Sequence, residues 1–249
     1  MSQPELSAQL LALADDELIL GHRDSEWTGH APILEEDIAF ANIAQDEIGH
    51  AILWLGALHA LDGQEPDHLV FFRGPGEYRN AQIVELPKGD WAFSMLRQYL
   101  FDAAEAVRLP LLAASRHRPL AEAAAKIRTE EIYHLRHTQA WIQRLALGTD
   151  ESHRRVQAAL DQIWPFAMQL FIPLPGEAGL AAEGTLPEPQ LVRQAWLEAV
   201  VPFLAEGGLL VAEASPPAAT SREAHTPHLA DWLADMQSVA RLEGPDVRW

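Results

Sequence analysis

Two short segments place a glutamate three residues before a histidine within an apolar helical stripe. One is AQDEIGHA, which contains Glu47 and His50, and the other is RTEEIYHL, which contains Glu131 and His134. Residues three and four apart share one face of a helix, and the neighbouring positions on both stripes are mainly apolar. Each pair is therefore expected to face a helix-packed interior, where an unpaired carboxylate is costly.

Two other predicted helices carry acids at matching positions. Glu17 lies on a stripe with Leu10 and Leu13, and Asp102 and Glu105 lie together on one turn of a later helix. The chain order is then acid, Glu-x-x-His, acid, Glu-x-x-His, which is the ligand order of two-metal carboxylate sites in four-helix bundles. Carboxylates can bridge divalent ions, and imidazole suits iron or manganese. The sequence leaves open which of Asp102 and Glu105 would be the ligand.

The candidate metal ligands are Glu17, Glu47, His50, Asp102, Glu105, Glu131 and His134. They would hold two iron or manganese ions, whose charge four carboxylates would neutralise. A metal-free polar network is the alternative, in which Arg23, Arg97, Lys126 and Arg128 enter the core and pair with the acids. His137, one turn from His134, could orient a ligand through a hydrogen bond.

Composition narrows the possible functions. The formal charge is -18, with 36 acids against 18 bases, which is the opposite of what nucleic-acid binding favours. The chain has no cysteine, which excludes thiolate chemistry and zinc fingers. We find no uninterrupted apolar run of membrane-spanning length and no secretory signal peptide at the N-terminus. A cytoplasmic protein that binds neither nucleic acid nor membrane is expected.

The hydrophobic pattern predicts an all-α chain. Long helices are expected at 5–24, 32–61, 91–116 and 119–147, with further helices at 150–171, 189–205 and 226–242. Pro110 and Pro165 are expected to disturb the helices that contain them. Residues 70–72 and 82–86 could form a short hairpin, and 173–188 and 214–221 are expected to be loops. The pattern favours a four-helix bundle at about 5–147 with appended helices at about 150–249, all in one domain.

Several stretches resemble one known family. They are SEWTGHAPILEEDIAFANIAQDEIGHA, RQYLFDAAEA, EEIYHLRHTQAWIQRLALGTDESHRRVQAAL and HTPHLADWLADMQ. They are similar to the C subunits of the bacterial complex that epoxidises the ring of phenylacetyl-CoA, a monooxygenase of phenylacetate degradation, and the similarity covers nearly the whole chain. The resemblance implies a ferritin-like fold and an accessory, structural role beside a homologous A subunit. In that family the A subunit holds the di-iron centre and binds the thioester, and a reductase and a small B subunit complete the system.

The chain departs from that family at the candidate ligands. Many C subunits have leucine and glutamine where this chain has Glu47 and His50, and lack an acid at the place of Glu17. The segment AQDEIGHA instead resembles the A subunit, although 26–36 and 131–158 are of the C type. A metal-active oxidase or oxygenase that uses its own iron or manganese site therefore remains the alternative to a non-catalytic subunit. Iron storage is a third interpretation, and a homodimer is possible when the chain is alone.

Overall fold

The structure, a computed structural model, describes residues 3–212 and 216–245, and these are helical with no strand, which confirms the all-α prediction. The long helices are α1 (Gln3–Ser25), α2 (Leu34–Asp62), α5 (Trp91–Leu112), α6 (Arg118–Ala146), α7 (Asp150–Ala167) and α9 (Pro189–Glu206). The shorter ones are α3 (Pro66–Phe71), α4 (Gln82–Glu85), α8 (Glu177–Ala182), α10 (Pro227–Met236) and α11 (Ser238–Glu243), with 3-10 turns η1 (Pro75–Glu77) and η2 (Met168–Phe171). No helix in this part of the chain is long and apolar enough to span a bilayer.

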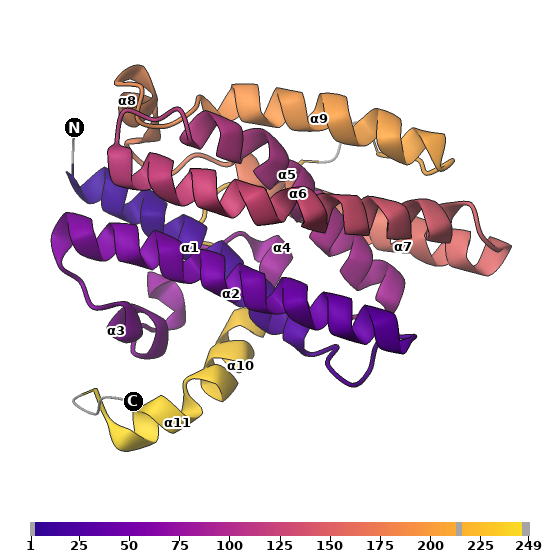
Figure 1. The fold of residues 1–249 in the computed structure, drawn as a ribbon, viewed down its shortest axis with the longest axis horizontal. Helices are drawn as coiled ribbons and strands as arrows, with labels where there is room; N and C mark the ends of the chain where they lie inside the picture. Colours follow the sequence, from indigo (N-terminus) through magenta and orange to yellow (C-terminus); the bar gives the residue numbers. More distant parts are fainter. Residues whose placement is uncertain (1–2, 213–215, 246–249) are drawn as a thin grey trace.

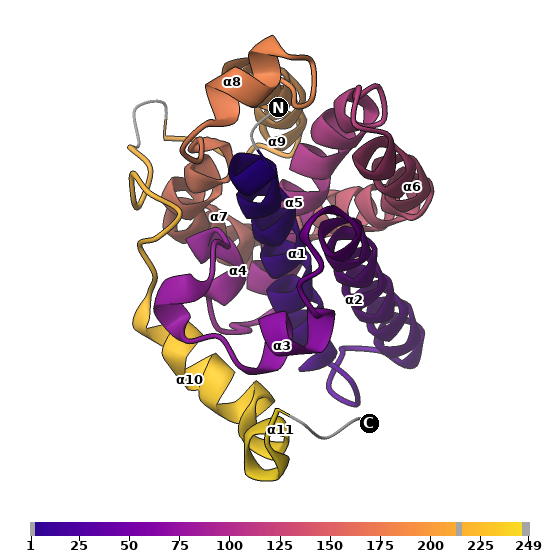
Figure 2. The same cartoon turned by 90° about the vertical axis from the view of Figure 1, so that its left-hand side faces the viewer.

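The helices α1, α2, α5 and α6 form the bundle. α1 packs along α2, α5 packs along α6, and α2 meets α6 where the two pairs join. Figure 1 shows these helices along the long axis of the molecule, and Figure 2 shows them closer to end-on. The expected ferritin-like arrangement is therefore present.

A glycine sets the spacing of α1 and α2. A Cβ atom on Gly21 would lie 2.9 Å from the backbone oxygen of Ala44 and 2.9 Å from the Cβ of Glu47. Only a residue without a side chain allows such a close approach of two backbones. Because Glu17 lies one turn before Gly21, this contact brings Glu17 to the level of Glu47.

Local signals set several helix ends as the sequence predicts. Gly63 has a φ of 77°, and its N–H donates to the His59 carbonyl, which ends α2 in a left-handed cap. Asp90 accepts a hydrogen bond from the Phe93 N–H at the start of α5, and Thr149 caps α7.

The predicted proline disturbances fall near helix ends. α5 continues past Pro110 but stops at Leu112, short of the expected residue 116. α7 contains Pro165 and gives way to η2 after Ala167. A proline removes one backbone hydrogen bond and crowds the preceding turn, and both costs are smaller where the helix is about to end.

The predicted hairpin is wrong. The segment 66–71 is the helix α3, and 82–85 is the helix α4, whose four residues are all buried. A short apolar run does not distinguish a buried strand from a buried helical turn. The expected loop 173–188 also contains α8, and the expected helix 226–242 is divided between α10 and α11. Part of the expected loop 214–221 lies outside the described residues.

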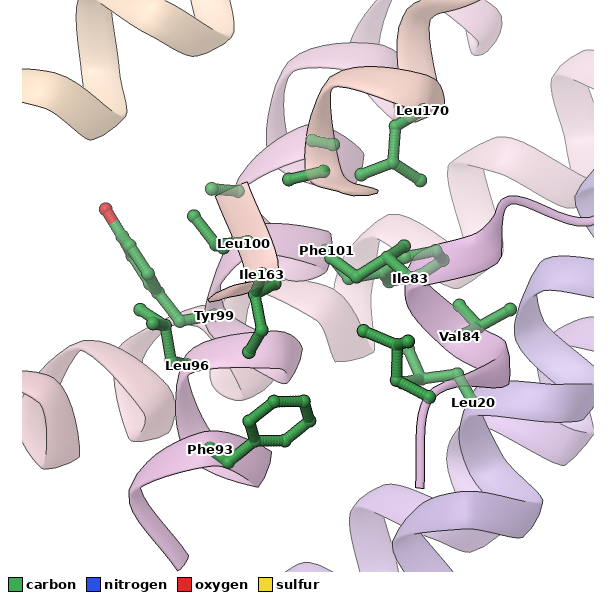
Figure 3. Close-up of a cluster of buried hydrophobic side chains, with 14 of the residues drawn as sticks. Leu20, Ile83, Val84, Phe93, Leu96, Tyr99, Leu100, Phe101, Ile163 and Leu170 are labelled. Atoms are coloured by element: carbon green, nitrogen blue, oxygen red, sulfur yellow. The ribbon is translucent and has the colours of Figure 1, made fainter. Parts of the chain in front are cut away.

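The helix α5 lies at the centre of the main hydrophobic core. Leu96, Leu100 and Phe101 on α5 gather with Ile83 from α4 and Ile163 from α7, as Figure 3 shows. On α9, Trp196 donates its indole N–H to the Leu100 carbonyl at 3.0 Å. Helices α7 and α9 thus pack directly on α5. The division into a core at 5–147 and appended helices at 150–249 of a single domain stays a prediction.

Candidate metal centre

Each bundle helix delivers its predicted acids to the interior. Glu17 comes from α1, the Glu-x-x-His pairs come from α2 and α6, and two acids come from α5. All of them are at most 3% exposed: Glu17, Glu47, His50, Asp102, Glu105, Glu131 and His134. The apolar stripes of the four helices bury these polar groups together because the groups share those stripes.

Four of these residues form a compact group. Glu17, Glu47, His50 and Glu131 each offer an atom that could bind a metal, and these atoms lie within 4.8 Å of one another. The His50 Nδ1 atom is 3.4 Å from Glu131 Oε1, 3.5 Å from Glu47 Oε2 and 3.8 Å from Glu17 Oε2. A buried set of three carboxylates and an imidazole suits a divalent metal ion such as iron or manganese.

His134 adds a second imidazole to the group and contacts Glu131 and Glu47. Its Nδ1 atom donates a hydrogen bond to Glu131 Oε1 at 3.0 Å and lies 3.4 Å from Glu47 Oε1. The sequence therefore predicted five residues that the structure brings together, one from α1 and two each from α2 and α6.

The two acids of α5 have other partners. Asp102 accepts hydrogen bonds from Gln98 and Thr138, each at 2.8 Å. Glu105 is 3.1 Å from Arg108 Nη2. Gln98 also donates to Glu47 Oε1 at 2.6 Å and so connects Asp102 to the group. The choice between Asp102 and Glu105 therefore stays open, although Asp102 has this connection.

Two acids outside the group fix the histidine rings, and sequence reasoning missed them. The His50 Nε2 atom donates to Glu130 at 2.8 Å, and the His134 Nε2 atom donates to Asp46 at 3.2 Å. The arrangement is reciprocal, because each acid precedes the glutamate of one pair and contacts the histidine of the other helix. These contacts turn both Nδ1 atoms inward. The sequence does contain a signal for them, because in both segments an acid directly precedes the Glu-x-x-His pair.

The bases named in the metal-free alternative lie elsewhere. Arg97 pairs with Asp24 at 2.9 Å, and Arg23 pairs with Glu26 at 2.7 Å. Lys126 and Arg128 are exposed. His137 lies 3.0 Å from Glu36 and thus faces an acid outside the group.

Several buried atoms of the group have no hydrogen-bond partner among the described residues. They are Glu17 Oε2, Glu47 Oε2, His50 Nδ1 and Glu131 Oε2. Buried polar atoms are rarely left unpaired unless a water or an ion completes them. This donor set therefore fits a divalent cation.

The histidines carry the positive charge when no metal is bound. Burial lowers the pKa of His134, but hydrogen bonds to Glu131 and Glu47 outweigh burial and raise the pKa to about 12. Burial is likewise outweighed at His50, where the carboxylates of Glu131, Glu17 and Glu47, 3.4, 3.8 and 3.5 Å from Nδ1, raise the pKa. Both imidazoles therefore hold a proton that a metal ion would have to displace.

The carboxyl groups divide into charged and neutral ones. Burial, together with the charge of Glu47, raises the pKa of Glu17 well above its usual value. Burial and the charge of Glu131 do the same at Asp102. Burial also acts on Glu47, but the neighbouring Glu17, His134 and His50 outweigh it and lower its pKa well below the usual value. Neutral carboxyl groups and imidazolium ions thus offset the charge of the inner group, whereas Glu105 is offset by Arg108.

The fold and this group define a helical-bundle protein of the ferritin-like class with a buried carboxylate–histidine group that could hold a metal ion. Residues 1–249 match the family model described as phenylacetic acid catabolic protein, and the chain belongs to that family. It is 36% identical over 247 residues to the C subunit of the 1,2-phenylacetyl-CoA epoxidase of Escherichia coli strain K12, covering 98% of this chain and 99% of that protein. It is 27% identical over 150 residues to the A subunit of the same bacterial epoxidase, covering 60% of this chain and 48% of that protein.

Proposed function

We propose that this chain is an accessory subunit of a multicomponent phenylacetyl-CoA epoxidase that works in the cytoplasm in aerobic phenylacetate catabolism. One observation carries the proposal: the similarity to the C subunit of the Escherichia coli epoxidase runs from end to end, at 36% identity. The similarity to the A subunit of that epoxidase covers only 48% of that protein. The chain is therefore assigned to the C type rather than to the catalytic type.

The partner we propose is the homologous catalytic A subunit, with a reductase and a small B subunit completing the complex. Exposed apolar side chains on α2 support a protein partner. Leu34, Ile38 and Ile52 are 70%, 56% and 63% exposed, and Ile38 and Ile52 are two heptads apart on one face. Exposed apolar residues that gather on one surface mark interaction sites in soluble proteins.

Co-purification tests this role. We expect the tagged chain to elute as one complex with an A-type subunit from the same organism, and we expect no epoxidation of phenylacetyl-CoA by the chain alone. Ile52→Glu should weaken the complex at least tenfold, whereas Leu242→Glu, an equally apolar position on α11, should leave it unchanged. Separate elution of the two proteins at micromolar concentration would contradict the accessory role.

We also propose a metal-active alternative, in which this chain binds two iron or manganese ions of its own. Glu17, Glu47, His50, Glu131 and His134 would hold the ions, together with Asp102 or Glu105. The unpartnered atoms of the buried group favour this proposal. Bound iron or manganese would supply redox and Lewis-acid chemistry toward dioxygen. The chain itself would orient both histidines through Glu130 and Asp46 and exclude water by burial of the group.

Metal analysis tests the alternative separately from the accessory role. The chain, purified after expression in iron- or manganese-supplemented medium, should contain about two ions per chain. Glu47→Ala should lose them, and Glu122→Ala on the exposed face of α6 should keep them. A content below about one ion per two chains would reject the alternative and leave the accessory role untouched.

A further inference from the structure

A cavity lies at the end of the bundle that is away from the α1–α2 connection. It is bounded by the first half of α1, the last turn of α5, the segment after η2, and the starts of α8 and α9. Both views place α8 beside the N-terminal end of α1 (Figures 1 and 2). The cavity has a volume of about 60 Å³, which is room for roughly four to six water-sized groups.

The wall of this cavity is mainly apolar. Leu13, Leu112, Phe171, Leu186 and Val192 all line it and are buried. A wall of this kind favours a ligand with an aliphatic part over a fully hydrated ion.

One charged side chain in the cavity still has hydrogen-bonding capacity. Arg108 is 12% exposed, and its buried Nη2 atom lies 3.1 Å from Glu105 Oε1 but has no partner with hydrogen-bond geometry among the described residues. An arginine has five N–H groups in a planar fork that matches a carboxylate. Arg108 therefore presents donors that the protein itself does not use fully.

The other charged groups of the cavity, Arg222 and Glu177, each have partners within the protein. Arg222 donates to the Arg79 carbonyl at 2.9 Å and pairs with Asp16. Glu177 accepts hydrogen bonds from Gln9 at 2.9 Å and from the Leu174 N–H at 2.8 Å through one oxygen. The remaining recognition element is thus the guanidinium of Arg108 beside an apolar wall.

We propose that this cavity binds a small aliphatic carboxylate, whose carboxyl group pairs with Arg108 and whose short chain lies against the apolar wall. A phosphate would leave its oxygens unpaired on that wall. A molecule of about six non-hydrogen atoms fits the volume. Arg108 is 3.1 Å from Glu105, one of the two candidate ligands on α5, so the cavity adjoins the candidate metal group.

The test uses butyrate and its neutral analogue butyramide with the full chain. Isothermal titration should show one butyrate per chain with a dissociation constant of about 1 mM, and butyramide should bind at least tenfold more weakly. Arg108→Gln should weaken butyrate binding at least tenfold. Arg155→Gln, at an exposed arginine of α7, is the matched control and should leave binding unchanged.

A second variant keeps the test independent of Arg108. Ala12→Leu places a larger side chain into the cavity from α1 and should abolish butyrate binding while Arg108 stays in place. Thermal unfolding shows whether each variant is folded, and the comparison of butyrate with butyramide on the unaltered chain needs no variant. Equal binding of the two molecules, or no saturable binding below about 10 mM, would overturn the proposal.

Discussion

In the inner group of Glu17, Glu47, His50, Glu131 and His134, histidines rather than arginine or lysine lie against the carboxylates. His134 donates to carboxylates through both ring nitrogens, to Glu131 at 3.0 Å and to Asp46 at 3.2 Å. A ring that donates twice is an imidazolium ion, and this agrees with its raised pKa of about 12. Protons and metal ions therefore compete for the same buried atoms.

Metal binding should consequently strengthen as pH rises. Glu17, His50 and His134 hold protons in the metal-free chain because their pKa values are raised. Affinity for Mn²⁺ should rise about tenfold per pH unit for each proton released, between about pH 6 and about pH 8. Titration calorimetry in buffers of different ionisation enthalpy counts the released protons. An affinity that does not change with pH would contradict this competition.

The stability of the metal-free chain should change in the opposite direction. A histidine whose pKa is raised on folding contributes stability that is present below its unfolded pKa of 6.5 and is lost as pH rises towards its folded value, about 12 for His134. The free energy of unfolding should therefore fall above about pH 6.5, by about 1.4 kcal/mol per pH unit for each such proton.

Urea unfolding in a metal chelator measures this slope. His134→Asn should reduce the slope, since it removes one of the two titrating rings. The control is His59→Asn on the exposed part of α2, which should leave the slope unchanged. A stability that rises from pH 7 to pH 9 would mean that the histidines are neutral in the folded chain.

The packing of α1 on α2 depends on one turn of α1. Gly21 meets the backbone of α2 at Ala44 and touches Glu47, whereas Gly49 on α2 has free space where a Cβ would lie. The two glycines therefore serve different purposes, although both lie within a helix. Only the first determines how closely the two helices approach.

Replacement of these glycines by alanine should have opposite effects. Gly21→Ala should destabilise the chain by about 1–3 kcal/mol, because the new methyl group forces the two helices apart. Gly49→Ala should be neutral or stabilising by up to about 1 kcal/mol, because alanine favours the helix. Chemical unfolding of both variants measures the difference. Equal effects would show that the close approach at Gly21 is not needed.

A single carboxylate ties the C-terminal helices to α4. Glu85 accepts hydrogen bonds from Asn80 at 2.9 Å, from His225 at 2.6 Å, and from the Thr226 N–H and hydroxyl at 2.6 and 2.7 Å. Thr226 precedes the first residue of α10. The position of α10 therefore depends on a residue far away in the sequence.

Removal of this charge should loosen α10 and α11 but not the bundle. Glu85→Gln replaces one acceptor oxygen by an NH₂ group that faces donors, which should cost about 2–3 kcal/mol locally. Hydrogen exchange should speed up in α10 and α11 and stay slow in α2 and α6. Faster exchange throughout the bundle would mean that Glu85 supports the whole core.

Sequence periodicity predicted the bundle and the buried group of two Glu-x-x-His pairs with Glu17. Both depend on the spacing of residues within single helices. Glu17 could be found in this way. Its neighbours Asp15 and Asp16, equally buried, pair with Arg73 and Arg222. Those partners come from segments whose position only the whole fold determines. For the same reason Gln98 and Thr138 were missed, and the short apolar segments of α3 and α4 were mistaken for strands.

The charge of the whole molecule should control its association with itself. With a formal charge of -18, two copies repel each other, while the apolar face of α2 that includes Ile38 and Ile52 favours contact. We therefore expect a weak homodimer whose dissociation constant falls by about tenfold between about 0.05 M and about 0.5 M NaCl, because salt screens the repulsion.

Sedimentation equilibrium at several salt concentrations measures this dissociation constant. Ile52→Glu should abolish the dimer at every salt concentration, and Leu242→Glu on α11 should not. An A-type partner should displace the second copy if both use the face of α2, since one surface cannot hold two proteins. A dimer that weakens as salt is added would instead show that ion pairs hold the two copies together, and that the apolar face of α2 is not the contact.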